Sequence, residues 1–229
     1  SVRLIIPWTA GGSTDSIGRI LAPKLAEYTG QQWIIDNRAG ATGTLGTTFA
    51  ARAPTDGYTL LLGTNSTFAI APHLYKTLQY DTEKAFAPVA LVAISPQILS
   101  VHPSLPVKNV KQLIALAKTR PGQIFYSTSG RGTVGHLAAE LLNSSAGIKL
   151  VHVPYKGAGP AVIDLIAGQV QMQFASIPLL VGHVKSGKLR MIAQSGEKRA
   201  ASAQDVPTMI ESGVRDFVVK GLFGFVGPA

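Results

Sequence analysis

Short apolar runs alternate along the chain with longer segments in which apolar residues recur at helical spacing. The first run, residues 2–6, has the β-branched bias of a buried strand, and apolar positions from Ile17 to Leu25 then fall on one face of a helix over 15–28. Helical segments between successive strands favour parallel pairing. The pattern therefore predicts the α/β class, with doubly wound sheets that carry helices on both faces. The same reading predicts further strands at 32–36, 58–62, 89–93, 97–101, 124–127, 150–153, 170–174 and 189–193, and further helices at 45–52, 110–118, 134–145, 161–167 and 178–186.

Two such sheets are expected, one in each half of the chain. Residues 100–106 contain two prolines between otherwise self-contained runs of helix and strand, which is typical of a domain boundary. A second crossing is expected near 221–227. The predicted domains are therefore 1–100 together with 221–229, and 101–220.

Composition limits the class of protein. With 229 residues, of which 46% are hydrophobic, the chain can bury a sizeable core. The absence of cysteine excludes disulfides, thiolate metal sites and cysteine nucleophiles. The apolar runs are too short for a spanning helix, which predicts a soluble protein, and the chain begins without the segments of a signal peptide, so any export signal has been removed or never existed.

The net charge of +9 favours anionic partners. The basic residues are scattered, without the dense stripe of a protein that binds a phosphate backbone, so no nucleic-acid partner is expected. The five histidines are far apart in the sequence and match no metal-ligand spacing, so no metal site and no cofactor is predicted.

Two loops rich in glycine and hydroxyl residues carry the clearest chemical signal. Residues 10–14 join the first strand to the first helix, and residues 129–133 repeat this arrangement in the second half. A loop in this position presents backbone N–H groups at the positive end of a helix dipole, which suits an anion. Glycine lets a ligand approach the backbone closely. The alternative is that both loops are ordinary tight turns with helix N-caps.

Other residues near these loops also bear on the site. Asp15 either complements the dipole of the first helix, meets a ligand, or orients the loop so that its amides point inward. Trp8 is either a buried loop aromatic or a lid over an apolar ligand body. His136 and Glu140, four positions apart, are expected to form a contact on a helix surface, and His152 is expected to be a core residue.

Rival motifs are absent. The chain contains no P-loop, no dinucleotide-binding glycine pattern and no G-x-S-x-G nucleophile elbow. The sequence therefore gives little support for a hydrolase or a nucleotide-binding protein.

Several longer motifs resemble one known family. The stretches PWTAGGSTDSIGRIL, DNRAGATGTLG, STSGRGTVGHLAAELL and VHVPYKGAGPAVIDLIAGQVQMQF are similar to the Bug receptors, the extracytoplasmic solute receptors of tripartite tricarboxylate transporters (TTT). The resemblance runs from residue 2 to about residue 228. It implies a two-lobed periplasmic binding protein-like fold (type II) with a ligand cleft between the lobes. It also implies a binding protein and not an enzyme.

In such receptors, ligand carboxylates are held mainly by loop amides, hydroxyls and ordered water. The resemblance implies a small mono- or dicarboxylate ligand, delivery to a TTT membrane subunit, a periplasmic location after removal of a signal peptide, and a monomer. The ligand contacts that it implies are Trp8, Thr9, Ala10, Gly11, Gly12, Ser13, Thr14, Asp15, Asn65, Ser66, Thr67, Ser127, Ser129, Gly130, Gly132, Thr133, His136, Tyr155, Lys156 and Ser176.

The sequence departs from the family pattern at two points. Many relatives carry an acid after the strand that ends at Phe174, where this chain has Ala175 and Ser176. An amino-acid ligand that needs a counter-charge there is disfavoured, and a plain carboxylate, including an aromatic one, is favoured. The chain also stops at Ala229, where relatives continue, so the helices that complete the first domain are expected to be missing.

Three alternatives remain open. An effector-sensing domain of a transcription regulator shares the two-lobed architecture, but no helix-turn-helix segment precedes residue 1. A carboxylate sensor coupled to signalling would use the same cleft. A small-molecule enzyme lacks a recognisable nucleophile, base or metal site.

Overall fold

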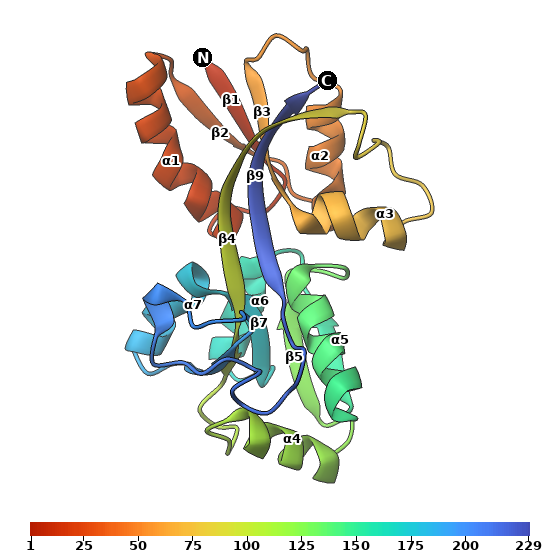
Figure 1. The fold of residues 1–229 in the computed structure, drawn as a ribbon, viewed down its shortest axis with the longest axis vertical. Helices are drawn as coiled ribbons and strands as arrows, with labels where there is room; N and C mark the ends of the chain where they lie inside the picture. Colours follow the sequence, from red (N-terminus) through yellow and green to blue (C-terminus); the bar gives the residue numbers. More distant parts are fainter. The chain divides into compact units, whose positions relative to one another are not determined.

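Two α/β units make up the structure, a computed structural model that describes residues 1–229 (Figure 1). Unit 1 comprises residues 1–94 and 222–229, and unit 2 comprises residues 95–221. Strands β4 (Phe86–Val101) and β9 (Lys220–Pro228) contain the positions at which the chain passes from one unit to the other.

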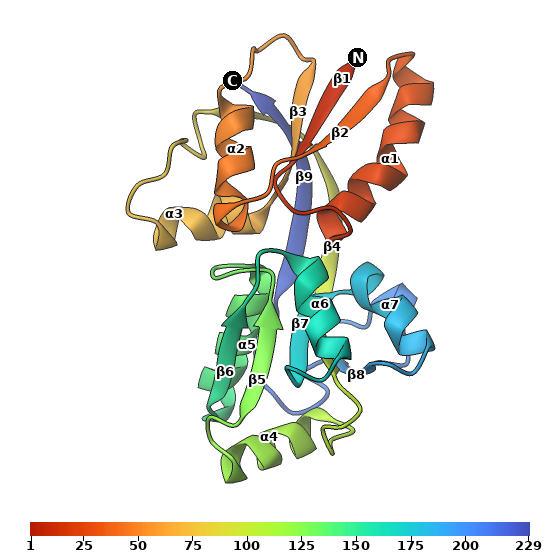
Figure 2. The ribbon, with the colours of Figure 1, turned by 180° about the vertical axis from the view of Figure 1, so that it is seen from behind.

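Unit 1 is a mixed sheet with a helix against each face (Figure 2). Leu4 and Ile6 of β1 pack with α1, whereas Ile5 between them packs with α2 on the other face. A strand covered on both faces is apolar wherever it is covered, which explains the continuous apolar run at residues 4–6, whereas Arg3 near the start of β1 is exposed. The strand order is β2-β1-β3-β9-β4. The elements are β1 (Val2–Ile6), α1 (Ser13–Thr29), β2 (Trp33–Asn37), α2 (Thr44–Ala51), β3 (Thr59–Thr64), a π-helical turn (Ser66–Ile70) and α3 (Ala71–Leu74).

Unit 2 repeats this plan with its own two core clusters. Leu99 and Val101 of β4 face a cluster that contains α4 and α5, whereas Ile98 faces α6 and α7. The strand order is β4-β7-β5-β6, and β8 pairs with β4. The elements are α4 (Val110–Thr119), β5 (Ile124–Thr128), α5 (Val134–Ala146), β6 (Leu150–Pro154), α6 (Ala158–Ile166), β7 (Met172–Ser176), α7 (Ile177–Lys185) and β8 (Arg190–Gln194).

The predicted two-lobed α/β class is confirmed, but the expectation that every strand pairs in parallel and is followed by a helix is wrong. β4 pairs antiparallel with β7 and β8, and β9 pairs antiparallel with β3. The two strands predicted at 89–93 and 97–101 form the single 16-residue strand β4. The hydrophobic pattern does not fix strand direction, and α/β sheets commonly include antiparallel strands beside parallel ones.

The structure shows no helix that is both long and apolar enough to cross a membrane.

Candidate functional site

The carboxyl ends of β1, β2 and β3 meet at one edge of the unit 1 sheet, because these three strands are parallel. Three loops follow them, at residues 7–12, 38–43 and 65–67. We call this set of loops, with the first turn of α1, the carboxyl edge of unit 1. The predicted contacts from Trp8 to Asp15 and from Asn65 to Thr67 therefore lie on one side of one unit.

Helix α1 begins in the first of these loops without a side-chain cap. Its N-cap is Gly12, which makes no side-chain hydrogen bond, whereas the N-cap of α4, Asn109, accepts a hydrogen bond from the backbone N–H of Gln112. The first N–H groups of a helix have no partners within the helix. The sequence at the start of α1 therefore leaves the positive end of the helix without the cap that α4 carries.

Asp15 is buried directly behind this loop, with 3% of its side chain exposed. Its Oδ2 accepts hydrogen bonds from the Gly11 N–H (2.9 Å) and from Arg19 Nε (2.8 Å), and its Oδ1 accepts one from Asn37 Nδ2 (3.0 Å). Burial alone would raise the pKa of Asp15, but the hydrogen bonds from Arg19, Gly11 and Asn37 outweigh it and hold the pKa below its usual value. This arrangement favours the reading in which Asp15 orients the loop.

Three buried polar side-chain atoms at this edge have no protein partner: Trp8 Nε1, Thr9 Oγ1 and Thr64 Oγ1. Buried polar groups are normally hydrogen-bonded, so such atoms call for a ligand or an ordered water. Thr64, the last residue of β3, was missed by the sequence analysis. Its place at the carboxyl end of a strand is the signal that could have found it.

The second loop of this edge was also missed. Gly40, Ala41, Thr42 and Gly43 all have positive φ, between 46° and 139°, although two of them carry a Cβ. Gly43 lies against the indole of Trp8, since a Cβ built on it would be 3.1 Å from Trp8 Cζ2. Non-glycine residues with such backbone angles cost roughly 1–3 kcal/mol each and concentrate at functional sites. The sequence signal was the pair of glycines that flanks Ala41 and Thr42.

The third loop is tied by hydrogen bonds to its own strand and to other parts of unit 1. Thr67 Oγ1 donates to Thr64 O (3.0 Å), and the Tyr80 hydroxyl donates to Thr67 O (2.8 Å). Asn65 Oδ1 accepts from the Leu222 N–H (3.3 Å). Asn65 and Thr67 therefore make internal contacts in addition to any role in binding.

Unit 2 has a corresponding carboxyl edge, because β5 is parallel to both β6 and β7. Its main loop, residues 128–133, is fixed by its own hydroxyls. Thr128 Oγ1 and Thr133 Oγ1 both donate to Gly130 O, at 3.1 and 2.9 Å, and Ser127 Oγ donates to Ala161 O at 3.2 Å. The hydroxyls of Thr128 and Thr133 therefore shape the loop, whereas that of Ser127 ties β5 to α6. The backbone N–H groups of Gly130, Gly132 and Thr133 also donate within the unit, to Thr128 Oγ1, His136 Nδ1 and Gly130 O.

The other predicted contacts of unit 2 lie around this loop. The Tyr155 N–H donates to Thr128 O (3.0 Å), which ties the start of the next loop to the first. The Tyr155 hydroxyl donates to Asp164 Oδ2 (2.6 Å), and its pKa rises to about 12 through burial and this carboxylate. Lys156 is exposed, and Ser176 is buried at the carboxyl end of β7.

A column of three stacked rings contacts the unit 2 loop. The rings of His136 and His152 stack with centroids 4.1 Å apart, and Tyr126 stacks on His152 at 5.0 Å. His136 and Glu140 interact electrostatically, but Glu140 also accepts a hydrogen bond from the Tyr126 hydroxyl, and His136 packs in the column. The core reading of His152 is incomplete, since its Nε2 lies 2.6 Å from Thr128 Oγ1.

Both imidazoles of this column are shifted toward the neutral form. Burial lowers the pKa of His152 to about 4, with help from the nearby His136 and Arg131. Burial also lowers the pKa of His136, and Glu140 opposes that shift only in part. The column is therefore uncharged at neutral pH.

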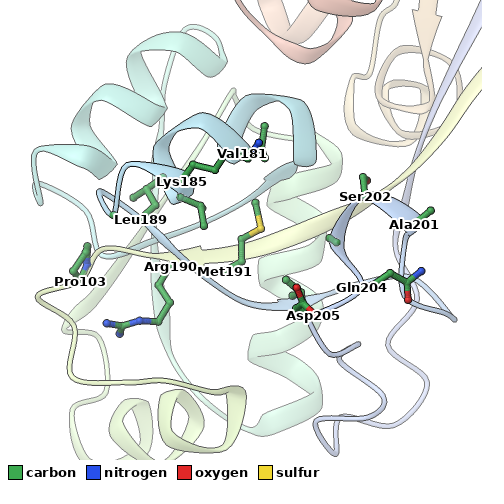
Figure 3. Close-up of a pocket in the computed structure, with 14 residues that line it drawn as sticks. Pro103, Val181, Lys185, Leu189, Arg190, Met191, Ala201, Ser202, Gln204 and Asp205 are labelled. Atoms are coloured by element: carbon green, nitrogen blue, oxygen red, sulfur yellow. The ribbon is translucent and has the colours of Figure 1, made fainter.

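No group of three or more His, Asp or Glu side chains is placed to hold a metal ion. A separate pocket of about 660 Å³ lies elsewhere in unit 2, between α7, β8 and residues 201–206 (Figure 3). Val181, Lys185, Arg190 and Met191 line it, and none of the predicted contacts does. Arg190 is partly engaged there, since its Nη1 donates to Val107 O (2.9 Å).

Comparison with known proteins gives consistent matches over nearly the whole chain. The family model described as tripartite tricarboxylate transporter family receptor matches residues 17–229. The protein BugT of Bordetella pertussis is 36% identical over 228 residues, which cover 99% of this chain and 70% of BugT.

Solved structures also match over the full length of the chain. The structure of Rpa4515 from R. palustris with adipate has a TM-score of 0.97 at 37% identity, over 100% of this chain and 76% of that one. The structure of MatC (Rpa3494) from Rhodopseudomonas palustris with bound malate has a TM-score of 0.92 at 31% identity, over 100% of this chain and 78% of that one.

Proposed function

Because this chain belongs to the tripartite tricarboxylate transporter receptor family, we propose that it captures a small dicarboxylate, and that the carboxyl edge of each unit is suited to a carboxylate group. The family consists of solute receptors, so the chain is a binding protein and not an enzyme, and no comparison supports a transcription regulator. The relatives whose structures contain adipate and malate both hold linear dicarboxylates. A linear dicarboxylate is therefore the ligand class to test first.

The observation that carries this proposal is the set of unpartnered buried polar atoms on Trp8, Thr9 and Thr64. An indole N–H and two hydroxyls can donate to a carboxylate directly or through an ordered water. The uncapped start of α1 adds the positive end of a helix dipole beside them. Asp15 does not repel the anion, because Arg19 neutralises its charge.

The carboxyl edge of unit 2 is an uncharged surface that also suits a carboxylate. Its loop is held in shape by Thr128 and Thr133, and the rings that contact it are neutral. No acid stands at the carboxyl end of β7, where the chain has Ala175 and Ser176, so this position offers no counter-charge for the ammonium of an amino acid. This favours a plain carboxylate over an amino acid.

Receptors of this family are periplasmic, and we place this chain there as a soluble monomer from which a signal peptide has been removed. Its partner in that compartment would be a TTT membrane subunit. The support for this partner is the family membership alone.

A matched pair of threonine variants tests the proposed site. Thr64→Val removes a hydroxyl without a protein partner, so we expect stability to stay the same or rise slightly, and affinity for adipate or malate to fall about tenfold. Isothermal titration calorimetry with both compounds measures the affinity, and thermal unfolding measures the stability.

Two controls locate the effect. Thr48→Val removes a hydroxyl that donates within α2, to Thr44 O, and should leave the affinity unchanged. Lys185→Gln alters the separate pocket of unit 2 and should also leave it unchanged. An unaltered affinity in Thr64→Val, or a loss of affinity in Lys185→Gln, would show that the dicarboxylate binds somewhere else.

A further inference from the structure

The two carboxyl edges are built on the same backbone device. In unit 1, the Gly11 N–H donates to the side chain of Asp15, four residues ahead, at 2.9 Å. In unit 2, the Gly132 N–H donates to the side chain of His136, also four residues ahead, at 3.2 Å. In both cases the donor residue precedes the N-cap, and the acceptor is the third residue of the helix that follows. The two acceptors differ in charge, because one is a carboxylate and the other an imidazole.

We propose that His136 is a positioning residue for ligand binding, the neutral counterpart of Asp15, which holds the loop 128–133 in its binding conformation by accepting the Gly132 N–H at Nδ1. This inference rests on the proposed function, since it explains how the unit 2 edge is kept ready for an anion.

The neighbour one helical turn further on explains why the acceptor in unit 2 is neutral. Four residues after Asp15 stands Arg19, which pairs with its carboxylate at 2.8 Å. Four residues after His136 stands Glu140, which accepts a hydrogen bond from the Tyr126 hydroxyl. A carboxylate at position 136 would face Glu140 without a cation of its own on the helix. An imidazole supplies the acceptor without adding a second negative charge beside an anion site.

The hydrogen bond also fixes the chemical state of His136. A backbone N–H is always a donor, so Nδ1 must carry a lone pair and the ring proton must sit on Nε2. An imidazolium donates from both nitrogens and cannot accept the Gly132 N–H. The loop therefore depends on a neutral ring at this position.

The stacked column keeps the ring neutral. His152 on β6 lies against His136 at 4.1 Å, and Tyr126 on β5 stacks beyond it. A charge on either imidazole would face its neighbour and Arg131 of the loop, and only Glu140 would favour it. His152 also reaches the loop directly, through the contact of Nε2 with Thr128 Oγ1 at 2.6 Å. Two rings of the column thus hold two separate points of the same loop.

Substitutions at position 136 separate acceptor geometry from charge, with adipate as the probe in calorimetry at pH 7.5. His136→Gln provides a neutral acceptor and should retain most of the affinity, as in a capping box. His136→Leu provides none and should weaken adipate binding about tenfold or more. His136→Asp copies unit 1 without its arginine and should also weaken binding. His136→Asp combined with Glu140→Gln, which removes the like charge, should recover most of that loss.

The pH dependence of adipate affinity distinguishes this role of His136 from a purely structural one. As the pH falls toward 5, the wild type should lose adipate affinity more steeply than His136→Gln. Adipate itself titrates in the experiments with both proteins, so the difference between their pH profiles reports the protonation of the His136 ring. His183→Gln, on α7, is the matched control and should follow the wild type.

Nuclear magnetic resonance tests the inference even if adipate is not the ligand. The side chain of His136 should carry its proton on Nε2 at neutral pH, and the Gly132 amide should be protected from exchange. If the wild type binds neither adipate, malate nor another dicarboxylate, the proposed function fails, while the tautomer and the amide still decide the role of His136. A proton on Nδ1, or equal adipate affinities for His136→Gln and His136→Leu, would overturn the inference.

Discussion

At the scale of single residues, two glycines in the helices of unit 2 show how local space decides the effect of one methyl group. A Cβ on Gly135, at the start of α5, would lie 2.4 Å from the backbone oxygen of Phe174. A Cβ on Gly182, inside α7, would meet nothing within 4 Å. Gly135 therefore lets α5 approach β7 closely, whereas Gly182 has no such constraint.

We expect these two sites to respond oppositely to the same substitution. Gly135→Ala should lower the free energy of unfolding by about 2 kcal/mol, because a backbone atom cannot move aside cheaply. Gly182→Ala should raise it by about 0.5–1 kcal/mol, because alanine stabilises a helix interior relative to glycine. Thermal unfolding should show Tm about 4–8 °C lower for the first variant and about 1–4 °C higher for the second. Shifts of the same sign would contradict the packing at Gly135.

At the scale of elements, the ring column joins β5, β6 and α5 and makes their packing sensitive to acid. A histidine in an unfolded chain has a pKa of about 6.5, whereas burial lowers that of His152 to about 4. The unfolded state therefore binds protons first as the pH falls, so stability is lost between these two values and is unaffected above about pH 7.

Urea unfolding should measure this loss. We expect the free energy of unfolding to be about 1 kcal/mol lower at pH 5 than at pH 7.5, allowing for partial screening by solvent. His152→Gln keeps a group that can bond Thr128 but removes the titration, so it should flatten the pH dependence. An equally steep dependence in that variant would assign the acid sensitivity to other groups.

The elements also show what hydrophobic patterning can and cannot predict. The strand at residues 2–6 and the helix that begins at 134 follow from their own residues, because burial on known faces fixes the spacing of apolar positions. The direction of β4 does not follow from its own residues. An apolar strand pairs equally well in parallel or antiparallel, and the direction depends on how the chain connects it to the rest of the sheet. The paired histidines, 16 positions apart in sequence, are joined by the register of β5 with β6 and by the packing of α5.

The candidate site was predictable to a similar extent. The loops at 10–14 and 129–133 were found because glycines and hydroxyls follow a strand and precede a helix. The local pattern could not show that Asp15 has both its oxygens occupied within unit 1, or that Thr64 carries an unpartnered hydroxyl. Both facts depend on which strands are neighbours in the sheet, and this is a property of the tertiary structure.

At the scale of the whole molecule, the net charge of +9 should act on the rate at which a dianion arrives. The cations are spread over the sequence and are mostly exposed, so salt screens them: the Debye length falls from about 30 Å at 0.01 M to about 8 Å at 0.15 M ionic strength. The polar atoms proposed to hold a carboxylate are buried, so salt would screen their interactions with it far less. We therefore expect the association rate constant of adipate to fall several-fold over this range while the dissociation rate constant stays nearly constant. Stopped-flow fluorescence in a Trp33→Phe background, which leaves Trp8 as the reporter, measures both rate constants. If salt instead changed only dissociation, the charge of the protein would act within the bound site and not by steering the ligand toward it.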